Sequence, residues 1–153
     1  MSEEQVGLVQ KNTAFIDDAD WFLQELVQQA NTSLDLQIPI TLQVSGLLVS
    51  GILVGGWQYF EGIADEISGE IKDDVELAKK VKEGYLSFGL IYKEMLENKA
   101  SVNDQPPMFL HLRETRYFNT AGQPIPTNRG VFWRGRIHEV AGFHFGQLSS
   151  QQN

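Results

Sequence analysis

The clearest pattern of apolar and polar positions lies in residues 34–44, LDLQIPITLQV, where the two kinds of residue alternate. A period of two places the apolar side chains on one face of a strand, so this segment predicts a strand with one buried face. Pro39 cannot donate a hydrogen bond to a neighbouring strand, which predicts an edge strand or a bulge. Ser45-Gly46 predicts a two-residue hairpin turn, and the apolar run of residues 47–54 predicts a central strand after it.

Apolar residues at helical spacing predict three helices. Residues 17–33 predict an N-terminal helix, which Asp17 or Asp18 would cap. Residues 57–68 predict a short helix, and residues 73–98 predict a long central one. Two glycines weaken the long helix, so a kink or a break is expected within it.

The last third of the chain predicts the remaining strands. Residues 108–118 predict one strand, and a turn rich in proline and glycine follows it. Residues 130–148, GVFWRGRIHEVAGFHFGQL, predict a strand, a tight bend and a second strand, which together form a final hairpin. The sum is a single α+β domain over residues 1–153, with an antiparallel sheet of about five strands. We expect the N-terminal helix and the long central helix to pack on one face of this sheet, with flexible ends at 1–12 and 149–153.

Composition narrows the class of protein. The 153 residues carry a net charge of −8, which argues against binding to duplex nucleic acid or to an anionic membrane. The absence of cysteine excludes disulfides and thiol chemistry. The N-terminus lacks the basic start and apolar run of a signal peptide, and the longest apolar run is too short to span a bilayer. We therefore expect a soluble cytoplasmic protein.

The charges are distributed unevenly along the chain. Residues 1–105 hold 18 acidic residues and seven lysines, whereas residues 106–153 hold five arginines and two acidic residues. This pattern predicts either a solvated acidic helical region beside a mildly basic sheet, or two opposed patches that attract a partner or a second copy.

The strand of the final hairpin carries the residues with the most functional promise. Its alternation places Trp133 on the core side, together with Val131, Gly135 and Ile137. The opposite side carries the candidate binding residues Phe132, Arg134, Arg136 and His138. They predict a basic stripe that anchors an acidic partner, because arginine is frequent at interface hot spots. The alternative is that the arginines face water and pair loosely with Glu114 or Glu139.

Other chemistry has weaker support. A metal site would need His111, His138 and His144, whose spacing matches no metal motif. The segment FWRGR could stack single-stranded nucleic acid, but the acidic charge opposes this. The acidic pairs along the chain suit helix capping better than acid–base catalysis, and no nucleophile motif is present. We expect no catalytic residue, no metal and no cofactor.

Three segments resemble the family of the gas vesicle accessory protein GvpU. They are SLDLQIPITLQVSGLLVSGILVGGWQYFEGI (33–63), FLHLRETRYF (109–118) and GVFWRGRIHEVAGFHFGQL (130–148). The last of these is the most specific, because an aromatic pair, Arg-Gly-Arg and Glu-Val-x-Gly rarely coincide at fixed spacing. The resemblance implies a non-enzymatic cytoplasmic protein that associates with gas vesicles and helps them to assemble or to cluster.

The resemblance also implies partners. We expect binding to the vesicle shell, to other gas vesicle proteins or to further copies of the chain, through the final hairpin. Phe132, Arg134, Arg136 and His138 would contact the partner, while Trp133, Gly135, Gly142 and Gly146 would hold the shape of the hairpin. Two alternatives stay open. One is a general interaction module for another acidic partner, and the other is a small-ligand or metal-binding protein that uses the histidines.

Overall fold

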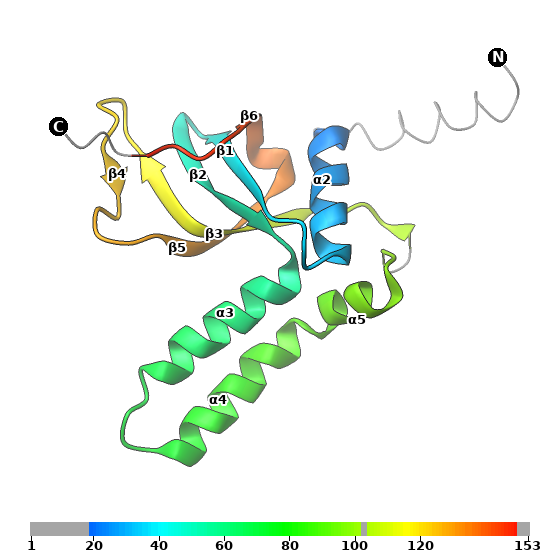
Figure 1. Cartoon of the computed structure of the whole chain (residues 1–153), viewed down its shortest axis with the longest axis vertical. Coiled ribbons are helices and arrows are strands. Elements are labelled where there is room, and N and C mark those ends of the chain that lie inside the picture. Colours follow the sequence, from blue (N-terminus) through cyan, green and yellow to red (C-terminus); the bar gives the residue numbers. More distant parts are fainter. Residues whose placement is uncertain (1–18, 102–103, 150–153) are drawn as a thin grey trace, which may run out of the picture.

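The computed structural model describes residues 19–101 and 104–149 (Figure 1). In order, its helices and strands are α2 (Trp21–Thr32), β1 (Ile38–Val44), β2 (Leu47–Val54), α3 (Gly56–Gly69), α4 (Val75–Phe88), α5 (Leu90–Asn98), β3 (Phe109–Phe118), β4 (Pro124–Ile125), β5 (Val131–Arg136) and β6 (Val140–Phe145). All strand pairs are antiparallel. The α+β class is therefore confirmed, with the two-residue β4 as a strand that was not predicted. The expected flexible end at 1–12 and most of that at 149–153 lie outside the described residues.

The sheet is built around β2, which lies between β1 and β3 as its apolar character predicts. β6 pairs with the other side of β1, while β4 and β5 pair with the other side of β3. Of the two expectations for this strand, the edge position is wrong because β1 is an interior strand. Its pairing with β6 does shift in register, but between Gln43 and Val44 rather than at Pro39. Pro39 is tolerated because it lies just beyond the residues of β1 that pair with β6, where its carbonyl accepts a hydrogen bond from the backbone N–H of Gly146 (2.8 Å).

A three-residue connection determines the curvature of the sheet. β5 and β6 lie at opposite ends of the strand order, yet only the 3₁₀ turn Ile137–Glu139 separates them. In a flat sheet they would lie about 19 Å apart, since neighbouring strands are about 4.8 Å apart. The chain from Arg136 to Val140 spans at most about 14 Å, and less in a 3₁₀ turn. The sheet must therefore curl until its two edges approach each other at this point.

This connection also corrects the predicted final hairpin. β5 pairs with β3 and β6 pairs with β1, so the two strands do not pair with each other. The bend between them is the 3₁₀ turn Ile137–Glu139. Ile137 is buried in the core, and its N–H donates to the carbonyl of Met108 (2.9 Å). The turn is thus anchored to the interior, which directs the chain across to the far edge of the sheet.

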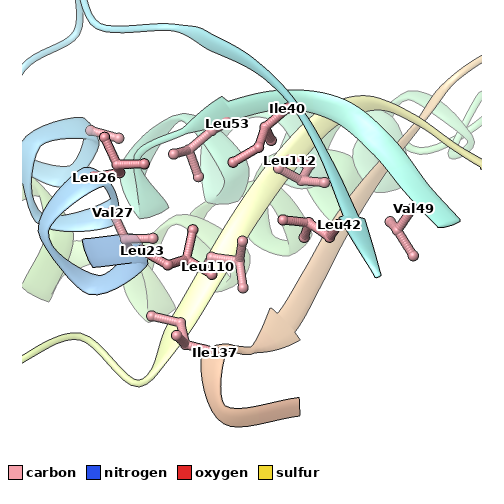
Figure 2. Close-up of a cluster of buried hydrophobic side chains, with 11 residues drawn as sticks. Leu23, Leu26, Val27, Ile40, Leu42, Val49, Leu53, Leu110, Leu112 and Ile137 are labelled. Carbon is pink, nitrogen blue, oxygen red and sulfur yellow. The ribbon is translucent and has the colours of Figure 1, made fainter. Parts of the chain in front are cut away.

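Helix α2 covers the hollow face of the curled sheet (Figure 2). Asp20 caps this helix, because its Oδ1 accepts hydrogen bonds from the N–H groups of Phe22 (2.8 Å) and Leu23 (3.4 Å). Asp17 and Asp18, the predicted caps, lie outside the described residues. The core cluster contains Leu23, Leu26, Val27, Ala30, Ile40, Leu42, Val49, Leu53, Leu110, Leu112 and Ile137. Burial of these apolar side chains is the main stabilising contribution here.

The remaining helices, α3, α4 and α5, form a separate helical layer beside the sheet. α3 and α4 pack as an antiparallel helical hairpin that extends away from it, and α5 returns to pack against α2 (Figure 1). The long helix predicted over 73–98 is therefore two helices, broken at Gly89, which is one of the two glycines expected to weaken it. No residue of α4 is fully buried, which fits a helix that contacts little besides α3.

The helices cover both faces of β3, although one covered face was expected. α2 packs on the face that carries Leu110 and Leu112. Tyr59 of α3 and Tyr92 of α5 contact His111, whose side chain points to the opposite face because neighbours alternate along a strand. The reason is that α3 to α5 form an insertion between two adjacent strands, β2 and β3, and fold back over the outer face.

The contact between α3 and β5 predicts opposite effects for two helical glycines. A Cβ at Gly62 would lie 2.1 Å from the ring of Phe132, whereas a Cβ at Gly84 would meet no atom within 4 Å. We expect Gly62→Ala to lower the free energy of unfolding by about 1–3 kcal/mol through overpacking. Gly84→Ala should raise it by about 0.5–1 kcal/mol, because alanine favours the helix. Urea denaturation of both variants would measure this, and equal effects would contradict the α3–β5 packing.

Candidate functional site

The two faces of β5 have the orientation that its alternation predicts. Trp133 lies opposite Leu112 of β3 and packs against the core cluster. Gly135 lies on the same face, and a Cβ there would be 2.1 Å from the Trp133 ring, so this position leaves no room for a side chain. Arg134 lies on the outer face, opposite His111 of β3. Arg134, one of the predicted binding residues, therefore lies on the face of β5 that points away from the core.

Arg134 and His111 form a polar pair across these strands. Nη1 of Arg134 lies 2.5 Å from Nε2 of His111 and donates a second hydrogen bond to the hydroxyl of Tyr92 (3.2 Å). The guanidinium carbon also lies 4.1 Å from the ring centroid of Phe109 and 5.8 Å from that of Phe60, within the range of cation–π attraction. Arg134 is therefore held by several contacts and is not a freely moving surface side chain.

Aromatic rings from two helices enclose His111. Tyr59 lies 4.7 Å and Phe60 6.2 Å from the His111 ring centroid, both from α3. Tyr92 of α5 meets the imidazole edge to face at 5.3 Å. These separations are typical of attractive aromatic pairs. We call Tyr59, Phe60, Tyr92, Phe109, His111 and Arg134 the His111 cluster.

Burial and the charge of Arg134 shift the pKa values of two members of this cluster, His111 and Tyr59. Desolvation, reinforced by the positive charge of Arg134, lowers the pKa of His111 from 6.5 to about 3. The imidazole is therefore neutral near pH 7, and Nε2 can accept from Arg134 if Nδ1 carries the proton. Nδ1 has no hydrogen-bond partner among the described residues. Burial also raises the pKa of the Tyr59 phenol, although the charge of Arg134 opposes this shift.

The four predicted binding residues separate into two pairs. Phe132 and Arg134 are engaged in internal packing, since Phe132 lies beneath α3, with its ring 6.2 Å from that of Tyr59. Arg136 and His138 lie further along the chain, with 2.6 Å between Nη2 and Nε2. Glu139 approaches both of them, at 4.0 Å from Arg136 and 3.4 Å from His138. Phe132 is thus covered by α3, whereas Arg134 and Arg136 are exposed and His138 is half-buried, so these three can meet a partner.

The glycines assigned to the final hairpin do not lie together. Gly135 is on β5, while Gly142 is on β6 at the other edge of the sheet, opposite Gln43 of β1. Gly146 follows β6 with a φ of +107°, a conformation that favours glycine. These positions shape two separate edges, because the hairpin that would unite them does not form.

The sequence did not identify the aromatic part of this site. Tyr59, Phe60 and Tyr92 were assigned to helices without a functional role, and His111 was considered only as a metal ligand. The alternation of side chains along a strand does place Phe109 and His111 on the same face. What it could not supply was the pairing of β3 with β5 and the return of α5 over that face.

The arrangement gives little support to metal chemistry. The described residues hold no group of three or more histidine, cysteine, aspartate or glutamate side chains that could bind a metal ion. His144 lies on β6, and its Nδ1 is 3.1 Å from the carbonyl oxygen of Phe145. The three histidines are thus distributed over different parts of the sheet.

Within residues 19–101 and 104–149, no helix has the length and apolar character that crossing a membrane requires.

The buried imidazole predicts a pH dependence of stability. Between pH 6.5 and about 3, the unfolded chain binds a proton at His111 that the folded chain does not bind. This lowers the free energy of unfolding as pH falls, by up to about 1.4 kcal/mol per pH unit, and has no effect above this range. His111→Gln cannot titrate, yet its carbonyl oxygen can still accept from Arg134. We expect the stability of this variant relative to the wild type to rise steadily as pH is lowered from about 7 to about 4.

Urea denaturation at a series of pH values would measure this difference, in which the shared contribution of the carboxylates cancels. His144→Gln is the matched control, because His144 is exposed and water reaches its imidazole in the folded chain. Its profile should run parallel to that of the wild type. A parallel profile for His111→Gln as well would show that His111 is not held neutral by the cluster.

Comparison with known proteins identifies the family. A family model described as "Gas vesicle protein GvpU-like" matches residues 20–148, which include every described helix and strand. No match is found among curated proteins or among solved structures. The match confirms the resemblance carried by the three sequence segments and extends it over the α3–α5 insertion. The chain belongs to the GvpU-like family of gas vesicle proteins.

Proposed function

We propose that this protein is a non-enzymatic gas vesicle accessory protein, which acts in the cytoplasm by binding the vesicle shell, its own copies, or both. The family match over residues 20–148 is the observation that carries this proposal. Binding of either kind would bring vesicles together or assist their assembly. The absence of a nucleophile motif and of cysteine from the sequence is consistent with a binding role.

The surface at the end of β5 is the best candidate for this contact. The side chain of Arg136 is 57% exposed, and its approach to Glu139 at 4.0 Å is too long for a strong ion pair. His138 lies beside it, and the fixed guanidinium of Arg134 lies on the same strand. An acidic partner would meet positive charge on a rigid sheet edge here, which favours recognition.

The protein itself carries a complementary surface. The connection between α3 and α4 and the adjacent helix ends expose the acidic side chains Asp65, Glu66, Glu70, Asp73, Asp74 and Glu76. Lys82 pairs with Asp65 at 2.8 Å, and Arg129 approaches Glu66 only to 4.0 Å. Most of this acidic charge is therefore available to the basic β5 surface of a second copy. Contacts of this kind between opposed patches would generate open assemblies.

A general interaction module for another acidic partner is the alternative. It would use the same β5 surface, and vesicle association distinguishes the two. In that case the tagged protein would stay in the soluble fraction when intact gas vesicles are floated by centrifugation.

Charge reversal at Arg136 tests the proposed surface. We expect Arg136→Glu to lower the fraction of protein that floats with intact vesicles, with affinity reduced about fivefold or more, which corresponds to about 1 kcal/mol. Arg129→Glu is the matched control, because it makes the same change at a side chain that is 68% exposed and lies outside the β5 surface. Arg134 is unsuitable for this test, since its contacts with His111 and Tyr92 belong to the fold.

Pressure-collapsed vesicles provide the second control in this assay, since they do not rise. Wild-type protein that rises only with intact vesicles supports the accessory role. Equal flotation of the Arg136→Glu and Arg129→Glu proteins would exclude the β5 surface as the contact. Wild-type protein that never floats would leave the general interaction module as the better description.

Self-association through opposed charges predicts a dependence on salt. The Debye length falls from about 10 Å at 0.1 M to about 3 Å at 1 M salt, so attraction between exposed patches weakens. We expect light scattering by the concentrated protein to decrease as salt rises over this range. Scattering that increases with salt would indicate apolar contacts between copies instead.

A further inference from the structure

A cavity lies where α2, α5 and the segment before β3 meet. Its volume is about 260 Å³, and its wall includes Ile91 and Met95 of α5, Asn31 of α2, and Pro107 and Met108. Most of this lining is apolar. Figure 1 shows α2 and α5 side by side. The β5 surface proposed for vesicle contact has no part in this cavity.

Asn31 places an unused hydrogen-bond donor at this cavity. Its side chain is only 1% exposed, and its Oδ1 accepts from the N–H of Gly56 at the start of α3 (2.9 Å). Its Nδ2 has no hydrogen-bond partner among the described residues. A buried donor without an acceptor is unfavourable, and most such groups in proteins have a partner. An occupant with a carbonyl oxygen would supply one.

The rim of the cavity indicates a protein partner rather than a small molecule. Ile91 and Met108 line it, yet their side chains remain 47% and 65% exposed. A small molecule inside the cavity would leave much of this apolar rim in water. A protein segment that inserts one side chain would also cover the rim, as anchor residues at interfaces do. The volume of about 260 Å³ is likewise below the range of about 300–1,000 Å³ that is usual for small-molecule sites.

A second hollow adjoins the first and differs from it in charge. Its volume is about 230 Å³, and the two share Gln28, Gln105, Pro106 and Pro107. Glu25 and Asp104 line the second hollow, and no lysine, arginine or histidine does so among the described residues. A cationic side chain suits this hollow, whereas the first suits an apolar one.

We propose that the two hollows together bind a segment of a protein partner in which an apolar residue adjoins a lysine or arginine. The apolar side chain fills the cavity beside Met95, and a backbone carbonyl of the segment accepts a hydrogen bond from Nδ2 of Asn31. The basic side chain lies in the second hollow near Glu25 and Asp104. This proposal goes beyond the vesicle role and does not depend on it.

The methionines offer a direct test. The chain has three, Met1, Met95 and Met108, and the last two line the cavity. Protein labelled with carbon-13 at the methionine methyl groups and uniformly with nitrogen-15 would be titrated by NMR with the peptide Ac-Lys-Leu-Lys-NH2. We expect the Met95 and Met108 signals and the side-chain amide of Asn31 to shift, with a Kd of about 1 mM or below for so short a probe.

Matched probes separate the parts of the proposal. Ac-Lys-Gly-Lys-NH2 lacks the apolar side chain, and Ac-Glu-Leu-Glu-NH2 reverses the charge, so both should bind at least fivefold more weakly. Equal binding of the glycine peptide would reduce the interaction to general charge attraction and overturn the proposal. N-acetyl-leucinamide that binds as tightly as the full peptide would make this a small-molecule pocket, which also overturns it.

Neighbouring residues of α5 provide the matched protein variants. Ile91→Ser should weaken binding of Ac-Lys-Leu-Lys-NH2 at least threefold, because Ile91 lines the cavity. Leu90→Ser should change it less than twofold, since Leu90 is similarly exposed but lies outside the lining. Equal effects of the two substitutions, or unmoved Met95 and Met108 signals in the wild type, would reject the site. Neither result would bear on vesicle flotation, so the two proposals fail separately.

Discussion

The three residues that join β5 to β6 impose the constraint on which the rest of this fold depends. Since Ile137–Glu139 cannot bridge the width of a flat five-strand path, the sheet must curl, and the curl creates a hollow face and an outer face. The hollow face is closed by α2, whose apolar stripe fills it. Ile137 couples the two features, because the residue that makes the bend is also buried in the core. A sheet without this bend would leave one side of the core without cover.

The outer face explains why a buried histidine is tolerated. α3 to α5 enter between β2 and β3 and return over the outer side of β3, so a residue there loses contact with water. His111 remains neutral in that setting and accepts from Arg134, which in turn holds Tyr92. The cluster thus holds the helical insertion against the sheet through the hydrogen bonds of Arg134 with His111 and Tyr92, which aromatic rings surround. Its polarity makes it specific, since an apolar residue in place of His111 would leave Arg134 with fewer acceptors.

Local patterns in the sequence predict most of the individual strands and helices. They do not predict which strands pair, and the features that depend on this pairing were missed. Alternation predicted the buried side of β5 and the separation of Trp133 from Arg134, and the Ser45-Gly46 turn joins β1 to β2 with positive φ at both residues, as the predicted hairpin requires. The final hairpin failed because two consecutive strands joined by a short bend usually pair, and nothing in residues 137–139 shows that they cross to different edges. The His111 cluster was missed for the same reason. Its members are distant in sequence, and only the order of the strands brings them together.

Tyr92 links the two surfaces of this protein that have functional promise. Its hydroxyl accepts a hydrogen bond from Arg134, its ring packs on Phe60 at 5.9 Å, and Tyr92 also lines the cavity together with Asn31. Asn31 in turn holds the first residue of α3, the helix that covers Phe132 and His111. A segment bound in the cavity therefore touches two residues that position the helices over β5. The wall of the cavity and the contacts that hold α3 and α5 over β5 therefore share Asn31 and Tyr92.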